Sequence, residues 1–384
     1  MSDFFAQIIA EIRRLNQAGP EDFLPLHAPV FQGREREYVL QTIDSTFVSS
    51  VGAFVDQFEE MLGRISEVKR AVACVNGTAA LEVALTLAGV RPDDLVLTQS
   101  LSFVATANAV RHVGAEPVFV DIDLETLGLS PEALKDFLHS RAEKTSQGPR
   151  DRQTGRRLAC CLPMHSFGLP CRLEELLGLC QDWGLPLVED AAEALGSSYQ
   201  GRPCGGFGIL GALSFNGNKI CTTGGGGAIL TNDPELGRLA KHLTTTAKRP
   251  HRWEFFHDQT AWNYRLPNLN AALGCAQLER LPEFVAYKRR LARDYQNFFV
   301  QGPWQSVVEK QGSHSNYWLN AVLLKNRDER DAFLDYSNNH QVQTRPAWEP
   351  LHTLPIYKNC PQGPLDNTLA VADRLVNLPS GVRQ

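Results

Sequence analysis

The sequence has little that would point to a membrane, secreted or metal-binding protein. Its apolar runs stop short of the roughly 18 uncharged residues that a membrane-spanning helix needs. The first residues include Asp3 and Glu-Ile-Arg-Arg at positions 11–14, without the apolar core of a signal peptide. The nine cysteines are odd in number and contain no Cys-x-x-Cys pair, so they predict neither a disulfide framework nor a zinc site. We therefore expect a protein of the reducing cytoplasm that has no membrane partner and no metal.

Strong charge of either sign is also missing. The formal net charge is −5 over 384 residues, which argues against general nucleic-acid binding. Hydrophobic residues make up 43% and charged residues 21% of the chain, as in ordinary globular proteins. This length can hold one large domain and a smaller one.

Short apolar runs alternate with helical patterns over most of the chain, which predicts an α/β fold with a mainly parallel sheet. The predicted strands are residues 71–75, 95–98, 117–121, 158–163, 185–189, 211–215 and 227–231. A long helix over residues 268–300, kinked at Pro282, is expected to lead into a smaller domain. We divide the chain into an N-terminal helical extension (1–23), a large domain (24–280) and a small C-terminal domain (281–384).

Lys219 is the first candidate for chemistry. It ends the run Ser-Phe-Asn-Gly-Asn-Lys, which begins at Ser214, and the glycines at 224–227 follow closely. A pyridoxal phosphate (PLP) site needs a lysine for the Schiff base, a hydroxyl for the phosphate, and glycines where backbone approaches the cofactor. Most lysines are solvated surface charges, so this pattern needs support from the rest of the chain.

Asp190 supplies part of that support. It ends the predicted strand at 185–189, and ligands bind at the carboxyl ends of strands in open α/β sheets. A buried carboxylate there would stabilise the protonated pyridine nitrogen of PLP. The neighbouring Glu189 is a rival that strand alternation would turn to the other face. An aspartate that caps the next helix is the plainer alternative.

A phosphate site is predicted where the strand at 71–75 turns into a helix. Gly77 permits close approach, Thr78 adds a hydroxyl, and the helix N-terminus favours an anion. Ser214 would reach the same phosphate from the other side. Any βα unit of an α/β protein could show this strand, turn and helix. Phe103 follows another strand and could stack on the pyridine ring. A phenylalanine of the apolar core is the plainer alternative for Phe103.

Three further patterns have plainer readings. Gly206-Phe-Gly-Ile-Leu-Gly211 matches a dinucleotide-binding motif, but a strand rather than a helix is expected after it. The basic run at 144–157 is more typical of a solvated loop than of a nucleotide site. His165 ends a predicted strand and could either line the pocket or be a structural histidine.

Several motifs occur together in one order. They are Asn-Gly-Thr at 76–78, Ser-Phe-Val-Ala-Thr-Ala-Asn at 102–108, Pro-Val-Phe-Val-Asp-Ile-Asp at 117–123, Pro-Met-His-Ser-Phe-Gly at 163–168, Glu-Asp-Ala-Ala at 189–192, the Lys219 run, Asn-Tyr-Arg at 263–265 and Pro-Leu-His at 350–352. This order resembles the DegT/DnrJ/EryC1/StrS family of nucleotide-sugar aminotransferases. The runs at 43–52, 222–227 and 242–248 look most similar to the 4-aminotransferases of legionaminic acid and N-acetylbacillosamine pathways.

The resemblance implies a fold type I PLP enzyme with a mainly parallel sheet in the large domain and a smaller α/β C-terminal domain. It implies the following roles: Lys219 as the Schiff-base lysine, Asp190 on the pyridine nitrogen, Gly77, Thr78 and Ser214 at the phosphate, and Phe103 on the ring. Asn263 is expected to reach the phosphate of a neighbouring subunit, which makes the site a property of a homodimer. Glu193 stands near the cofactor where many family members have Gln or His, and Gly225 stands where many have an acid.

The resemblance implies PLP-dependent transamination of a nucleotide-linked 4-keto-6-deoxyhexose, with L-glutamate as the amino donor. The expected substrate is a UDP-2-acetamido-2,6-dideoxy-4-ketohexose, and the product would serve bacterial surface-glycan synthesis. Candidate substrate contacts are His165, Asn216, Asn218 and Arg345. Alternatives are a 3-aminotransferase, a GDP-perosamine type of enzyme, and a PLP-binding regulatory protein.

Overall fold

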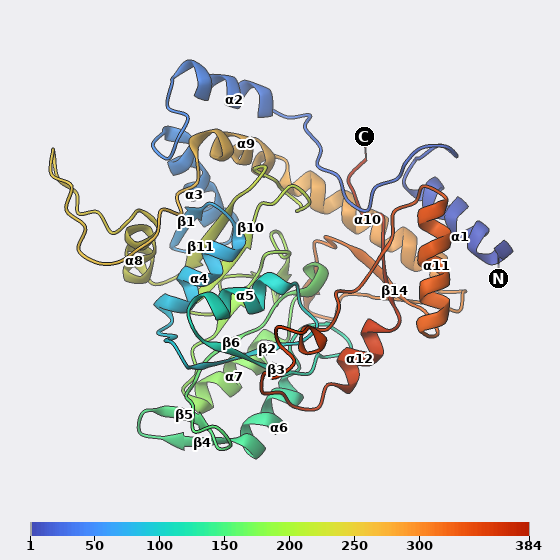
Figure 1. Cartoon of the computed structure of the whole chain (residues 1–384). Coiled ribbons are helices and arrows are strands. Elements are labelled where there is room, and N and C mark those ends of the chain that lie inside the picture. The colour runs from blue at the N-terminus through green and yellow to red at the C-terminus, as the bar shows by residue number, and fades with distance from the viewer. Residues whose placement is uncertain (1, 384) are drawn as a thin grey trace.

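The computed structural model describes residues 2–383, and at its centre lies a sheet in two halves of three and four strands. Figure 1 shows these strands surrounded by helices. Two halves, β3-β2-β6 and β7-β10-β11-β1, are joined by the parallel bridges Cys161–Leu187 and Met164–Asp190. Only β11 runs against its neighbours. The strands are β1 Arg70–Cys74, β2 Leu95–Gln99, β3 Glu116–Val120, β6 Leu158–Leu162, β7 Val188–Asp190, β10 Leu210–Ser214 and β11 Gly227–Thr231. The predicted mainly parallel α/β sheet is confirmed, with each strand shifted by a few residues at most.

Helices cover both faces of this sheet, and β1 shows why. Its residues Ala71 and Ala73 pack in one apolar core, while Val72 and Cys74 pack in another on the opposite face. The surrounding helices are α2 Glu35–Asp44, α3 Ala53–Ile65, α4 Gly77–Leu87, α5 Val104–His112, α6 Pro131–Arg141, α7 Leu173–Trp183, α8 Pro234–Thr244 and α9 Asn268–Glu279. Short strands β4 Ala142–Thr145 and β5 Gly148–Asp151 form a hairpin, and β8 Ser198–Tyr199 pairs with β9 Arg202–Pro203. All nine cysteines are free and buried, as core thiols.

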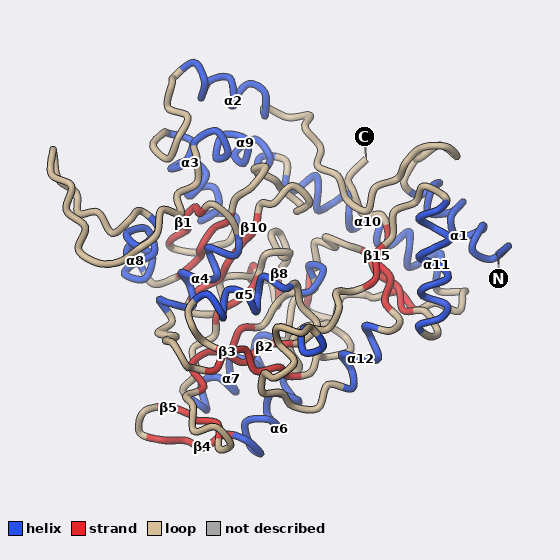
Figure 2. Tube along the Cα trace, in the orientation of Figure 1, coloured by secondary structure: helices blue, strands red, loops and turns tan. Residues whose placement is uncertain are grey.

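A second, antiparallel sheet follows the helix α10 (Leu281–Phe299) and lies apart from the central one (Figure 2). Its strand order is β12-β14-β16-β15. The elements of this part are β12 Gln305–Ser306, β13 Ser313–His314, β14 Asn320–Leu323, α11 Arg327–Asn339, β15 Arg345–Pro346, a short 3-10 turn at Leu351–Thr353, α12 Asp366–Ala372 and β16 Leu375–Leu378. Another 3-10 turn, Ser166–Gly168, follows β6 in the large part. The N-terminal helix α1 (Ser2–Leu15) lies beside α11, and its Phe5 and Ile12 share a core with Phe333. The domain boundaries at 23 and 280 stay a prediction.

The expectation of one kinked helix over residues 268–300 is wrong. The helix α9 ends at Glu279, Arg280 caps it, and α10 starts afresh at Leu281. Pro282 lies in the first turn of α10, where the missing N–H of a proline breaks no hydrogen bond. The proline therefore starts a helix here instead of bending one.

Two findings concern a membrane and a metal ion as partners. Among residues 2–383, no helix is both long and apolar enough to cross a membrane. Within the same range, no three His, Cys, Asp or Glu side chains are grouped as metal ligands would be.

Candidate active site

A cavity of about 280 Å³ opens at the carboxyl ends of β7 and β10, beside the N-terminus of α4. Segments far apart in the sequence line it, including the loop after β10 and two stretches beyond α10. The lining residues are Asn76, Gly77, Thr78, Leu81, Phe103, Ala105, Met164, Asp190, Ala192, Glu193, Ser214, Asn216, Asn218, Lys219, Gly225, Gly226, Trp318 and Trp348. Most residues predicted to hold a cofactor thus surround one space, at the sheet edge where ligands of α/β proteins bind.

Lys219 reaches this cavity from a tight turn, in which its backbone N–H donates to the carbonyl of Asn216 at 3.0 Å. Its Nζ lies 3.0 Å from Oε1 of Glu193 and 4.0 Å from the ring centroid of Trp318. The side chain is only 11% exposed. A carboxylate and an aromatic face thus hold the amine at the wall of the cavity.

Glu193 is buried beneath this lysine. Its Oε2 accepts the backbone N–H of Phe167 at 2.8 Å, which fixes the carboxyl group in place. Burial raises the pKa of Glu193, and the Lys219 amine opposes that shift. The carboxyl group is therefore suited to exchange a proton with the lysine or to hold it by charge.

Asp190 projects into the cavity from the end of β7. Its Oδ2 accepts the hydroxyl of Thr106 at 2.7 Å, and its Oδ1 accepts the N–H of Ala192 at 3.1 Å. Burial raises the pKa of Asp190, against the effect of these hydrogen bonds and of the nearby Lys219. A cationic group placed against this carboxylate would offset the cost of its burial.

Glu189, one residue earlier on β7, points the other way. It accepts N–H groups from Gly205, Phe207 and Gly208 and pairs with Nε2 of His165 at 3.1 Å. Burial opposes ionisation of Glu189, but these partners outweigh it and lower its pKa. The two adjacent acids therefore occupy different faces, as the alternation of a strand requires.

The opposite end of the cavity is formed by the first turn of α4. Asn76 caps this helix by accepting the N–H of Ala79 at 2.8 Å. The N–H groups of Gly77 and Thr78 belong to the first turn, which leaves donors without intrahelical acceptors. A Cβ on Gly77 would lie 2.9 Å from Cβ of Ser214, so only glycine allows this approach. The donor set suits a phosphate group.

Phe103 lies between these two ends. It directly precedes α5, lines the cavity, and is 49% exposed, which is high for a phenylalanine. An aromatic face left open toward a cavity is available for stacking on a planar ring.

Other predicted contacts are placed differently. Asn216 and Asn218 line the cavity and are joined by a 3.1 Å hydrogen bond. His165 does not line it: the side chain is fully buried, Nδ1 accepts the N–H of Cys171, and Nε2 faces Glu189. Of the two alternatives for His165, this arrangement fits the structural histidine, because both ring nitrogens already have protein partners.

Arg345 and Asn263 also lie outside the cavity lining. Arg345 is exposed on β15 and donates to Asn338 and to the carbonyl of Thr344. Its contact with substrate stays a prediction. Asn263 is exposed and accepts from Arg265 at 3.0 Å. It does not face its own chain's cavity.

The sequence reading missed Thr106, Met164, Trp318 and Trp348. Trp348 stacks on Phe167 with ring centroids 4.7 Å apart, so its position is fixed. Thr106 lies in the same motif as Phe103, in the first turn of α5. Its position three residues after Phe103 is the one sequence signal that could have placed its hydroxyl near the cavity. The tryptophans follow Lys219 by about a hundred residues or more, and no local pattern connects them to it.

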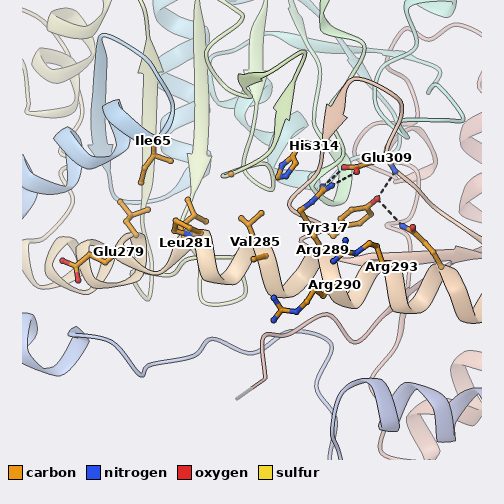
Figure 3. Close-up of a pocket in the computed structure, with 15 residues that line it drawn as sticks. Ile65, Glu279, Leu281, Val285, Arg289, Arg290, Arg293, Glu309, His314 and Tyr317 are labelled. Atoms are coloured by element: carbon orange, nitrogen blue, oxygen red, sulfur yellow. Dashed lines mark hydrogen bonds and ion pairs between the residues drawn. The ribbon is translucent and has the colours of Figure 1, made fainter.

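A larger cavity lies elsewhere. It is a groove of about 1020 Å³ along α10, and Figure 3 shows Val285, Arg289 and Arg293 pointing into it. Neither Lys219 nor Asp190 lines this groove. Size alone would therefore mislead, since the reactive groups converge in the smaller cavity.

The smaller cavity suits PLP in each of its parts. Donors for a phosphate lie at one end, the buried carboxylate of Asp190 lies at the other, and an amine and an open phenylalanine ring lie between them. A sequence model of the DegT/DnrJ/EryC1/StrS aminotransferase family matches residues 30–383. The chain belongs to this family. It is a PLP-dependent aminotransferase.

Relatives agree with this family assignment over nearly the whole chain. A GDP-perosamine synthase of Escherichia coli O157:H7 is 34% identical, covering 93% of each chain. The putative PLP-dependent aminotransferase EpsN of Bacillus subtilis is 35% identical, covering 93% of this chain and 90% of EpsN. Among solved structures, the aminotransferase TlmJ of Streptoalloteichus hindustanus superposes with a TM-score of 0.83 at 29% identity, covering 93% of each chain.

Gly77 allows a direct check of the phosphate end of this aminotransferase. We expect Gly77→Ala to weaken PLP binding by about tenfold or more, because the new methyl group must displace Ser214. Gly178→Ala is the matched control, since this glycine lies in α7 outside the cavity lining and its Cβ would meet no atom within 4 Å. Titration of the cofactor-free variants with PLP measures both affinities. Equal affinities for the two variants would contradict the assignment of the phosphate end.

Proposed function

We propose that this aminotransferase moves the amino group of L-glutamate to the C4 keto group of a nucleotide-linked 4-keto-6-deoxyhexose. The observation that carries the proposal is the position of Lys219 Nζ, held between Glu193 and Trp318 in a cavity that also contains Asp190. Relatives named GDP-perosamine synthase and spore coat polysaccharide biosynthesis protein SpsC support sugar chemistry for surface glycans.

The chain's own residues have distinct tasks in this scheme. Bound PLP would supply the carbon that carries the amino group and a ring that draws in the electrons left when the donor α-carbon loses its proton. Asp190 would face the positive charge of the ring nitrogen, and the first turn of α4 would hold the phosphate. Lys219 Nζ would move a proton from the donor α-carbon to the cofactor carbon in the first half of the reaction, and from that carbon to the sugar C4 in the second half. Glu193, at 3.0 Å, orients this amine between the two steps.

The open side of the cavity would take the sugar. Trp318 and Trp348 offer aromatic faces for a hexose ring, and Asn216 and Asn218 offer amide groups for hydroxyls or an acetamido group. The motif likeness to legionaminic acid and bacillosamine enzymes favours a UDP-linked 2-acetamido-2,6-dideoxy-4-ketohexose. The names of the 34% identical relatives favour a GDP-linked sugar as the second candidate.

We further propose a homodimer with a shared active site. The segment that precedes Asn263 exposes Trp253, Phe255 and Phe256 to solvent in the single chain, at 70%, 80% and 53%. Apolar side chains exposed to this degree on one loop are typical of a surface that a second subunit covers. Asn263 would then face the phosphate of the partner's cofactor.

A panel of keto sugars tests the substrate. The enzyme is first loaded with amino groups from L-glutamate and freed of donor. It is then mixed with UDP- and GDP-linked 4-keto-6-deoxyhexoses and with a 3-keto isomer. We expect one 4-keto sugar to react at least about a hundredfold faster than the 3-keto isomer. The reason is that the Lys219 amine has a fixed position, from which it can transfer a proton to C4 of the bound sugar but not to C3. Preference for the 3-keto isomer would contradict the proposal.

A further inference from the structure

One loop joins α10 to the lysine cavity. Residues 309–318 run from the edge of the second sheet to the wall formed by Trp318. On the groove side, Arg289 of α10 donates to Glu309 and to the carbonyl of Ser315, each at 2.7 Å. Figure 3 shows this cluster beside Tyr317. Arg289 therefore fixes the middle of the loop from outside.

The preceding residue, Lys288, fixes the end of the loop from inside. Its side chain is completely buried, and Nζ donates to the carbonyl of Trp318 at 3.0 Å and to that of Ser380. Burial lowers the pKa of Lys288 to about 7. A buried lysine with only carbonyl partners opposes folding, so an apolar residue would serve a purely structural position better.

Trp318, which the loop holds in place, contacts the reactive amine and the residue before it. Its indole Nε1 donates to the carbonyl of Asn218 at 2.7 Å, directly before Lys219 in the chain. Its ring face lies 4.0 Å from Nζ of Lys219. Two residues earlier, the amide of Asn316 donates to the carbonyl of Glu193 at 2.8 Å. The loop thus contacts both segments that form the ion pair of the site.

We propose that Lys288 is a positioning residue for the reaction, which acts by holding the Trp318 ring against the amine of Lys219. The inference rests on Lys219 as the reactive lysine and does not depend on which sugar is the substrate. In this arrangement the long helix α10 sets the position of the amine from the far side of Trp318.

Lysine labelling in the cofactor-free protein tests this directly. An amine-reactive reagent is applied briefly, and peptide mass spectrometry compares labelling at Lys219 with labelling at Lys241, a lysine on the outer face of α8. We expect Trp318→Leu and Lys288→Met each to raise the ratio by about 10- to 30-fold, since the loss of a desolvated cation–π contact frees the amine. The double variant should have the same ratio of Lys219 to Lys241 labelling as Trp318→Leu alone, because Lys288 acts through Trp318.

Trp304→Leu is the matched control. Trp304 is equally buried, but it packs against α1 and α11, away from the cavity. It should lower the unfolding temperature without changing the labelling ratio. If Lys288→Met does not fold, Lys288→Gln replaces it in the test. Glutamine keeps N–H donors, but its shorter side chain cannot reach the carbonyls of both Trp318 and Ser380. We expect about a threefold rise for this variant.

The rate of the first half-reaction gives an independent readout. With L-glutamate in a single turnover, both Lys288 variants should react more slowly, and the half-saturating donor concentration should stay the same, since Lys288 contacts no donor. An unchanged labelling ratio in the folded Lys288 variants would overturn the inference. So would effects of Lys288→Met and Trp318→Leu that simply add. Failure of every keto sugar would instead count against the proposed substrate and leave this result untouched.

Discussion

Replacement of Lys219 by alanine abolishes transamination. The amine is the basic group at the wall of the cavity, 3.0 Å from Glu193, and both proton transfers depend on it. Loss of a positioned general base alone costs about 10²- to 10⁴-fold in rate, and loss of the covalent link to PLP adds to this. We expect turnover to fall by at least about a thousandfold, together with the visible absorbance of lysine-bound cofactor.

The fold should tolerate this change. Lys219→Ala leaves Glu193 buried without a cation, but burial already raises the pKa of Glu193, so the carboxyl group takes up a proton. Lys241→Ala is the control, because Lys241 pairs with Glu59 at 2.6 Å outside the cavity. Circular dichroism and steady-state rates measure the two variants together. Retention of a tenth of the wild-type rate by Lys219→Ala would contradict the assigned role.

Asp190→Asn should cause the second largest loss. The amide keeps the shape of the carboxyl group: its one oxygen can still accept the N–H of Ala192, and its NH2 group can donate to the hydroxyl of Thr106. It carries no charge to stabilise a protonated pyridine nitrogen. Breaking a buried charge pair of this kind costs several kcal/mol, so we expect kcat to fall by about 10²- to 10³-fold. Measurement of kcat and of PLP affinity by titration checks this expectation.

The adjacent acid makes a matched comparison. Glu189→Gln breaks the buried pair with His165 on the other face of β7. It should lower the free energy of unfolding by about 3 kcal/mol and leave the half-reaction rate within about threefold of the wild-type value. Equal effects of the two variants on kcat would show that Asp190 has no special relation to the cofactor.

Local patterns in the sequence predicted the parts of the site that local structure builds. The run at 71–75 followed by Asn76 and Gly77 predicts a strand, a tight turn and a helix; the structure has β1 and α4 there, and Asn76 caps the helix. The apolar run before Asp190 likewise predicts its place at the end of a strand. These elements depend on side-chain alternation and capping, which neighbouring residues determine.

Contacts between distant segments could not be predicted in this way. Trp318 meets Lys219 only because α10 and the loop at 309–318 fold back over the cavity. His165 could equally have faced the cavity or Glu189 until the sheet registers were known. From the sequence, Pro282 predicts a kink, because its effect depends on where the helix begins and no local pattern shows that the preceding helix ends at Arg280.

The most direct test of the central claim is an absorbance spectrum of the purified protein with PLP, recorded before and after L-glutamate is added. If Lys219 and Asp190 form an aminotransferase site, a visible cofactor band is present at the start. Glutamate then replaces it with an ultraviolet band while 2-ketoglutarate forms in equal amount. A protein that shows no cofactor band after PLP is added, or a band that glutamate leaves unchanged, would contradict this account.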